Sequence, residues 1–447
     1  MELQTQHDNR LSLLPQHIQD DIFSFLSTQE LWKCCSVCSS WRSSILHWSD
    51  MWRYLSTHDN QKIVPALLPY RSYIKGPFVK AIAYGGDNDD EHFDAVTDFL
   101  VELNCDALVQ VAIISDYVVE SNIVRLLDMS SNTLTRIFVM FNDDDEANIM
   151  PDVILRHCPH LRHLYFVGSS YDEESWDPQR QLLDFQHQRL VDLEIEFYSI
   201  EGNFDIRPFL QATPKLKHLG LNINNIEHTW RTLPSLIHAH CPRLLSLFIV
   251  SNDDGGVVGM GDQEQEPFWR ENTRKTDYKE LLLATTSKDE PPASLQRLMV
   301  HNTFNDCEGG NELIPVLCEA FQNSLKHFDI KGRILFSESE ALTRFSRLHA
   351  VPNLTNITIY DLSGDVDDTL LESICTGSRY LEKLILEGCS NMTEAGLMDF
   401  LTNIAKQQQH SDAPTLRSIE FKGISAITSR VLDTIALEYH HMGELIF

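Results

Sequence analysis

Cysteine and histidine are the residues of this sequence whose types and spacing could support metal chemistry. Cys35 and Cys38 have the two-residue separation of a zinc-binding pair, and His157-Cys158 and His240-Cys241 each place a histidine beside a cysteine. A four-ligand zinc site needs a second closely spaced pair, and none follows Cys35 and Cys38. The two His-Cys pairs recur at one position of a repeat described below, which favours a structural role. We therefore expect no metal site and no cofactor.

Motifs of the common catalytic sites are missing from the sequence. It contains no glycine-rich Walker-type phosphate loop and no Gly-x-Ser-x-Gly turn that would expose a nucleophilic serine. None of the ten cysteines stands in the recognisable setting of a catalytic nucleophile. We assign no catalytic residue and expect the chain to act by binding other proteins.

The net charge of the chain indicates which classes of partner it can bind. The 447 residues include 36 Lys and Arg against 65 Asp and Glu, a net charge of −29. Nucleic-acid binding needs a basic face, so this balance argues against a nucleic-acid partner and favours a basic one. No apolar run is long enough for a membrane span, and the N-terminus lacks the apolar core of a signal peptide. We expect a cytoplasmic or nuclear protein, or both, with reduced cysteines.

Residues 11–55 carry a helical pattern without a long break. Pro15 suits a first helical position, where its missing N–H costs nothing. Apolar residues then follow at helical spacing, at Ile18, Ile22, Phe25 and Leu26. Ser27-Thr28-Gln29-Glu30 is typical of a capping box, which would start a second helix. Three helices of this length bury little apolar surface, so the unit is expected to be marginal without a partner.

This stretch resembles the F-box. The F-box opens on Leu-Pro, here Leu14-Pro15, and continues to a Val-Cys-x-x-Trp-Arg core at 37–42 and a late apolar-Trp pair at Met51-Trp52. Gln16-His17 replaces the acidic residue that usually follows Leu-Pro. The resemblance implies docking onto the Skp adaptor of a cullin–RING ubiquitin ligase. The adaptor contacts that it implies are Leu14, Pro15, Ile18, Ile22, Leu26, Leu31, Val37 and Trp41.

A repeat with the template Leu-x-x-Leu-x-Leu runs from Phe78 to the end of the chain. Clear copies start at Leu161, Leu190, Leu216, Leu244, Leu295 and Leu381. Most first positions, called anchors here, lie 26 to 30 residues apart, which is the leucine-rich-repeat period. Proline often stands two residues before the anchor, where it ends the preceding helix. Each repeat is predicted to be one strand and one helix, and the repeats to stack.

The predicted fold class is therefore α/β. A three-helix F-box at 10–56 and a linker at 57–75 precede a curved leucine-rich-repeat solenoid at 76–447, with parallel strands inside and helices outside. A long anchor spacing marks an inserted loop at about 252–276, which is rich in glycine and charge. Leu445-Ile446-Phe447 is predicted to form a short last strand.

Alternate strand residues face away from the helices, and their types predict a binding surface. In the first repeats these positions are apolar or aromatic, which predicts target-binding residues at Tyr84, Ile114, Phe138, Met140, Tyr165 and Val167. The alternative is that the linker or an N-terminal helix covers them. Acidic runs that each follow a strand, such as 143–146 and 365–368, predict a negative rim beside this surface.

These features together predict a substrate-recognition subunit of an SCF-type ubiquitin ligase. The F-box would dock the adaptor, and the repeats would hold a protein target that carries a basic segment. A scaffold that sequesters its partner without ubiquitylation is the alternative. Co-purification separates these alternatives, because a cullin should accompany a ligase subunit but not a scaffold.

Overall fold

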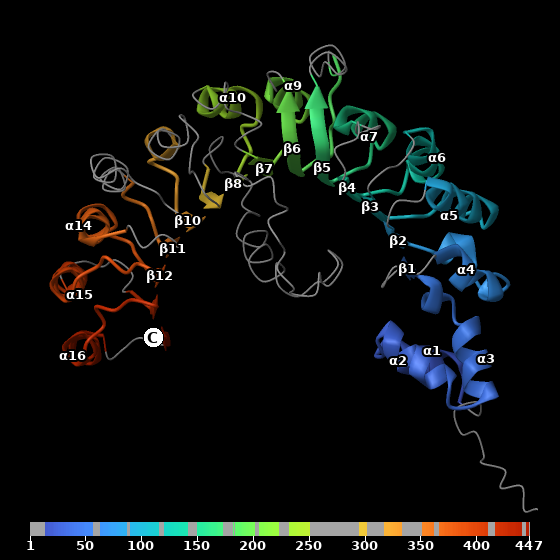
Figure 1. The fold of residues 1–447 in the computed structure, drawn as a ribbon, viewed down its shortest axis with the longest axis horizontal. Coiled ribbons are helices and arrows are strands. Elements are labelled where there is room, and N and C mark those ends of the chain that lie inside the picture. The colour runs from blue at the N-terminus through green and yellow to red at the C-terminus, as the bar shows by residue number, and fades with distance from the viewer. Residues whose placement is uncertain are drawn as a thin grey trace, which may run out of the picture. The chain divides into compact units, whose positions relative to one another are not determined.

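A computed structural model describes most of the chain (Figure 1). The described residues are 14–56, 63–86, 90–115, 120–141, 150–172, 182, 184–201, 205–222, 232–250, 295–301, 317–332, 351–361, 366–409, 416–439 and 444–446. They divide into two compact units, Met1–Tyr171 and Asp172–Phe447, which are considered separately. The predicted loop at 252–276 and the acidic run at 143–146 lie outside the described residues. No described helix is long and apolar enough to cross a membrane.

The first unit opens with short helices in the region of the F-box resemblance. They are α1 (Gln16–Ser24), α2 (Thr28–Cys35), α3 (Ser39–His47) and the 3-10 helix η2 (Ser49–Trp52). The predicted capping box is confirmed: Glu30 N–H donates to Ser27 Oγ at 3.3 Å, and Ser27 N–H donates to Glu30 Oε2 at 2.7 Å. The N–H and the hydroxyl of Ser27 both donate to the Glu30 carboxylate, which holds the pKa of Glu30 below its ordinary value. Pro15 was predicted at the first helical position, but it is the N-cap of α1, one residue before the first helical residue, Gln16.

The helices share a small core. Phe23, Ile45 and Trp52 are almost fully buried, and the Trp52 indole N–H donates to the Leu46 carbonyl at 2.9 Å. Cys35 and Cys38 have different places in this unit. Cys35 lies in the core, where burial raises the pKa of its thiol, whereas Cys38 Sγ caps α3 by accepting from the Trp41 N–H at 3.4 Å. Among the described residues, no group of three His, Cys, Asp or Glu side chains could hold a metal ion.

The helical region leads directly into the first repeat. Strand β1 (Tyr54–Ser56) pairs in parallel with β2 (Ala81–Gly86), so the end of the helical region supplies the first strand of the sheet. Between them lie α4 (Ile63–Leu67), η3 (Leu68–Tyr70) and η4 (Gly76–Phe78). The Tyr70 ring lies 5.2 Å from that of Trp32 and 5.8 Å from that of Trp52. The segment predicted as a linker therefore packs onto the helices.

The rest of the first unit alternates strands and helices. After β2 come α5 (Asp90–Glu102), β3 (Gln110–Ser115), α6 (Glu120–Ser130), β4 (Arg136–Phe141), α7 (Pro151–His157) and β5 (His163–Asp172). Strands β1 to β5 are parallel neighbours in chain order. The helices lie on one side of this sheet (Figure 1). An ion pair and a hydrogen bond link successive helices, with Arg125 Nη1 2.6 Å from Asp98 Oδ1 and His157 Nδ1 2.6 Å from Asp128 Oδ1.

The second unit repeats this architecture. Its strands are β6 (Asp192–Glu201), β7 (His218–Asn222), β8 (Ser246–Val250), β9 (Arg297–His301), β10 (His327–Gly332), β11 (Asn356–Asp361), β12 (Lys383–Glu387), β13 (Ser418–Lys422) and β14 (Glu444–Ile446), again parallel and in chain order. Its described helices are α9 (Arg207–Ala212), α10 (Leu233–His240), α14 (Asp368–Gly377), α15 (Glu394–Gln409) and α16 (Ser429–Glu438). The predicted α/β repeat fold is confirmed, and β14 is the predicted short last strand.

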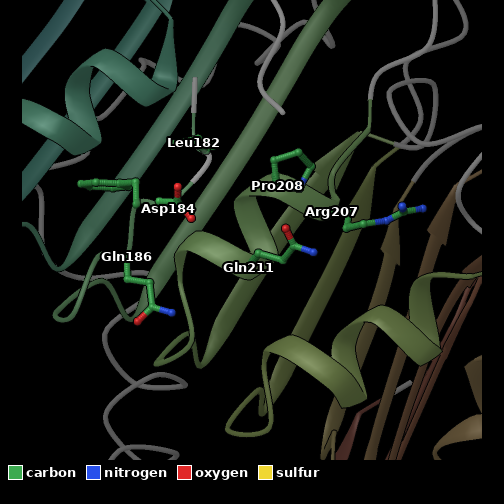
Figure 2. A pocket seen from close by; sticks show the side chains of 7 residues that line it. Leu182, Asp184, Gln186, Arg207, Pro208 and Gln211 are labelled. Carbon is green, nitrogen blue, oxygen red and sulfur yellow. The ribbon is translucent and has the colours of Figure 1, made fainter. Parts of the chain in front are cut away.

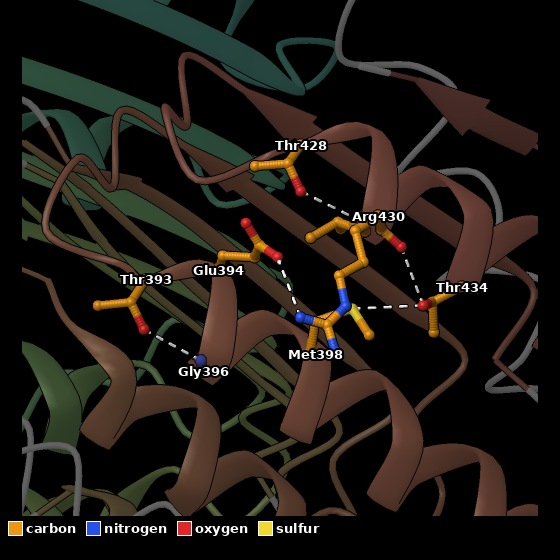
Figure 3. A network of polar contacts seen from close by, with 8 residues as sticks. Thr393, Glu394, Gly396, Met398, Thr428, Arg430 and Thr434 are labelled. Atoms are coloured by element: carbon orange, nitrogen blue, oxygen red, sulfur yellow. Dashed lines mark hydrogen bonds and ion pairs between the residues drawn. The ribbon is translucent and has the colours of Figure 1, made fainter.

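Polar contacts fix the last helices of this unit against one another (Figure 3). Arg430 of α16 lies 3.7 Å from Glu394 of α15, and Thr434 Oγ1 donates to Met398 Sδ at 3.3 Å. At the start of α15, the Asp368 carboxylate accepts from the N–H and the hydroxyl of Thr393, at 2.9 and 2.6 Å. Gly396 lies so close to this carboxylate that a Cβ at position 396 would overlap it.

The His-Cys pairs end helices at equivalent places. Cys158 is the C-cap of α7 and Cys241 is the C-cap of α10. Burial raises the pKa of each thiol to about 12. Both cysteines therefore act as small apolar residues at the turn into the next strand.

Candidate protein-binding surfaces

The N-terminal helices leave one apolar stripe exposed. Ile18, Ile22 and Phe25 follow helical spacing along α1, so they share one side of it, and Leu14 precedes the N-cap Pro15. Phe25, the C-cap of α1, is 86% exposed, and Leu14 and Ile22 are each more than a third exposed. Val37, in the turn between α2 and α3, is 64% exposed. An exposed phenylalanine beside other apolar side chains is typical of a surface that a protein partner covers.

The predicted adaptor contacts divide by exposure. Leu14, Pro15, Ile22 and Val37 are exposed, and Ile18, Leu26 and Trp41 are partly buried. Leu31 is 3% exposed and belongs to the core, so its prediction as a surface contact was wrong. Phe25 was not among the predicted contacts. The sequence did indicate its position, because Phe25 continues the helical spacing of Ile18 and Ile22.

The sheet of the first unit has a face turned away from the helices, called the sheet face here. The strand register places Ala112, Phe138 and Tyr165 in one row across it, and Ile114, Met140 and Val167 in the next. The rings of Phe138 and Tyr165 stack at a centroid distance of 4.7 Å and an interplanar angle of 1°. Ile114, Phe138, Met140 and Tyr165 are partly exposed, which agrees with the predicted surface, but Val167 is fully buried.

Tyr84 is the main correction to this surface. It was predicted to face outward, yet it is 3% exposed, pairs with Ile113, and packs its ring 5.1 Å from that of Phe93 in α5. The cause is a shift of one residue in the first repeat. Val79 fills the buried anchor position. Phe78, the predicted anchor, is 47% exposed. Ala83 and Gly85 therefore occupy the sheet face of β2.

The sheet face of the second unit carries a polar and charged row on its later strands. Lys331, Tyr360, Glu387 and Lys422 form one row across β10 to β13. Lys331 Nζ lies 5.8 Å from the centroid of the Tyr360 ring, and Lys422 forms an ion pair with Glu420. Burial, with the nearby carboxylates of Asp329, Glu387 and Glu420, raises the pKa of Tyr360. The carboxylates near Tyr360 therefore come from three other strands, β10, β12 and β13.

The described part of the acidic run at 365–368 has a structural role. Asp367 is the N-cap of α14 and accepts from the Thr369 N–H at 2.9 Å. Asp368 holds Thr393, as described above. At this position the carboxylates accept hydrogen bonds from backbone donors at the starts of α14 and α15.

A pocket of about 540 Å³ lies in the second unit, between the turn before β6 and α9 (Figure 2). It is lined by Leu182, Asp184, Phe185, Gln186, Arg207, Pro208 and Gln211. This lining combines one carboxylate, one guanidinium and two amides with apolar side chains. Among the residues that the structure describes, the lining includes no serine, cysteine or histidine.

Comparison with known proteins matches the N-terminal region to a family model. An F-box-like family model matches residues 11–58. No curated protein matches the sequence. Similar solved structures include the complex of Rad7 and Elc1 in yeast, with 13% identity, 97% of this chain and 86% of that chain covered, and a TM-score of 0.38. The leucine-rich-repeat-containing protein LegL7 from Legionella pneumophila has 12% identity, 81% and 99% covered, and a TM-score of 0.38. The TLR13–ssRNA13 complex has 11% identity, 88% and 56% covered, and a TM-score of 0.33.

Proposed function

We propose, from the F-box-like domain at residues 11–58 and the repeats that follow it, that this protein is the substrate receptor of an SCF-type ubiquitin ligase. The helices dock a Skp-type adaptor, and the adaptor connects the protein to a cullin and a RING subunit. The repeats hold a protein target near the ubiquitin-conjugating enzyme. The protein then contributes proximity and orientation, which raise the effective concentration of the target lysine.

The exposed apolar stripe of α1 carries this proposal. Phe25 is 86% exposed, whereas Phe23, two residues earlier in the same domain, is 1% exposed. Solvent contact with so large a side chain is unfavourable by about 1.5–3 kcal/mol relative to burial. An adaptor that covers Leu14, Ile22 and Phe25 would recover that free energy and would stabilise a small helical domain.

The connection between the helices and the repeats supports a positional role. Strand β1 joins the F-box-like domain to the sheet, and Trp32 and Trp52 pack on Tyr70 beyond it. These contacts restrict the motion of the first repeats relative to the docked helices. A restricted position of the target would raise the effective concentration of its lysine near the ubiquitin-conjugating enzyme.

The sheet face of the first unit is our proposed target site, through Ile114, Phe138, Met140 and Tyr165. Aromatic and methionine side chains are enriched in interface cores. The net charge of −29 favours a target with a basic segment, which long-range attraction would bring to the protein. The cytoplasm or the nucleus, where cullin–RING ligases work, is the proposed location.

The experiment is reconstitution of the full chain with a Skp-type adaptor, a cullin and a RING subunit. Wild-type protein should assemble with all three, and Leu14→Ala with Pro15→Ala should lose the adaptor while thermal unfolding of the repeats is unchanged. Adaptor binding that excludes the cullin would instead support the scaffold alternative. An adaptor that binds the double variant as it binds the wild type, or binds neither, contradicts the proposed docking.

A further inference from the structure

Cations gather at the edge of the second unit where strands β7 to β10 begin. Lys215 and Lys217 precede β7, Arg243 precedes β8, and Lys326 precedes β10. Lys215, Arg243 and Lys326 are exposed, and Lys217 is partly exposed. These four residues are called the basic edge here. Asp and Glu are missing from the described residues that lead into these strands, at 213–217, 241–245, 295–296 and 322–326.

Backbone hydrogen bonds determine how the cations line up. The Lys217 carbonyl accepts from two N–H groups at the start of β8, at 2.8 and 3.0 Å, and the Gln296 carbonyl accepts from two at the start of β10, at 2.8 and 2.9 Å. Three strand spacings separate β7 from β10, so the backbones at Lys217 and Lys326 lie about 14 Å apart, at ~4.8 Å for each spacing. Lys215 and Arg243 each precede a buried anchor leucine, so they occupy equivalent positions one spacing apart.

The positive charge of the basic edge is largely uncompensated. Its four cations form no ion pair with the residues that the structure describes. Helices α9 and α10 end at Ala212 and His240, a short turn before β7 and β8, so their C-termini lie at this edge. Each helix C-terminus carries at most about half a negative charge, so the two together offset about one of the four positive charges.

We propose that the basic edge binds a short acidic segment of a partner protein, with Asp or Glu side chains opposite Lys215, Arg243 and Lys326. An extended chain rises about 3.3 Å per residue, so about five residues span the distance from Lys217 to Lys326. The cations are spread along that length, and three of the four are lysines. This arrangement fits several separate carboxylates better than one phosphate, which a converging arginine fork would hold.

The length of the basic edge favours a short protein segment over a nucleic acid. Asp192 of β6, which pairs with His218, flanks the edge on one side, and Glu382, just before β12, flanks it on the other. A nucleic acid strand carries a phosphate on every nucleotide, so its charge would continue towards these carboxylates. The net charge of −29 still permits a short acidic ligand, because salt largely screens exposed charges more than about 8 Å apart at physiological ionic strength.

The inference goes beyond the proposed function and does not rest on the ligase role, because it needs no adaptor. The probe is a fluorescent peptide of about 12 residues, alternating Glu and Ser, which is long enough to span the edge. Its control has Gln in place of every Glu. Fluorescence anisotropy with the full-length protein gives both Kd values at ~0.05 M and ~0.3 M salt. At low salt the Glu peptide should bind at least about tenfold more tightly than the Gln peptide, and high salt should remove most of that difference.

Variants of exposed residues test the location. Lys215→Glu with Arg243→Glu should weaken the Glu peptide at least about tenfold, and Lys326→Glu should also weaken it. Lys215→Gln with Arg243→Gln should give a smaller loss, and it covers the case in which the Glu variant fails to fold. The control is Arg379→Glu with Lys406→Glu, which changes the net charge equally at exposed positions between α14 and β12 and on α15. It should lose less than about twofold, because salt screens its distant charges.

Five outcomes overturn the inference. They are equal binding of the Glu and Gln peptides, full affinity of the Glu peptide for Lys215→Glu with Arg243→Glu, an equal loss in the control pair, tighter binding of an oligouridine of the same charge, and tighter binding of a Gln peptide that carries one phosphoserine. Adaptor binding is measured on the same proteins and should not change in any variant. A wild-type protein that binds the Glu peptide but no adaptor would reject the ligase role and support the basic edge.

Discussion

Phe23 and Phe25 are two residues apart in the F-box-like domain, and their changes to alanine should have opposite consequences. Phe23 is buried at the centre of the helices, with its ring 5.5 Å from that of Trp48. Phe25 is 86% exposed at the end of α1. The two substitutions remove the same atoms, so any difference between them comes from their surroundings.

The magnitudes follow from burial. Phe23→Ala leaves a cavity in a small core and should cost about 3–5 kcal/mol of unfolding free energy. A helical unit of this size rarely has more than about 3–5 kcal/mol in total, so the domain should be largely unfolded. Phe25→Ala should change stability by less than about 0.5 kcal/mol, as is usual at the surface. It should cost about 2 kcal/mol of adaptor affinity, or roughly thirtyfold in Kd.

Two assays on the full chain separate these effects. Denaturant unfolding is followed by tryptophan fluorescence, to which the F-box-like domain contributes four of the seven tryptophans of the chain, and calorimetry gives the Kd for a purified Skp-type adaptor. Phe25→Ala with wild-type unfolding and weakened binding supports the stripe as the docking surface. If Phe25→Ala binds as the wild type does, the stripe is not the contact, and Val37 on the turn between α2 and α3 becomes the better candidate.

Three further predictions concern the repeats. Gly396→Ala should cost about 1–3 kcal/mol in denaturant unfolding, because its Cβ would displace the Asp368 carboxylate from the start of α15; Gly85→Ala, in open space, is the control. Leu384→Ala, at a fully buried position, should cost about 2–5 kcal/mol, whereas Glu387→Lys should cost less than about 1 kcal/mol, because it places like charges opposite each other on the surface. Burial raises the pKa of five thiols to about 12 from ~8.5 in the unfolded chain, so their contribution to stability is complete below pH ~8.5 and is lost as the pH rises towards 12. At pH 9 these thiols should react with iodoacetamide at least about 100-fold more slowly in the folded protein than in urea, as measured by mass spectrometry; they are Cys105, Cys158, Cys241, Cys318 and Cys375.

The repeat fold could be predicted from the sequence because its signal is long and regular. Leu161, Leu216 and Leu381 recur at one period and are buried in the structure, as the template requires. The register of the first repeat could not be predicted, because Phe78 and Val79 are adjacent and both apolar. A shift of one residue exchanges the two faces of a strand, so Tyr84 lies in the core and not on the predicted surface.

The exposed apolar residues of α1 could not be predicted for a different physical reason. Helical periodicity shows that α1 has apolar residues on more than one side, but it does not show which side faces the other helices. Phe23 and Phe25 have the same side chain and differ only in what α3 and the following turn cover, as the contact of Phe23 with Trp48 shows. Hydrophobicity scales treat both residues as core. A domain that binds through an apolar face needs apolar residues on its surface. The sequence indicates only that the apolar content of this domain exceeds what a small core can bury. The packing shows which of the apolar residues remain exposed.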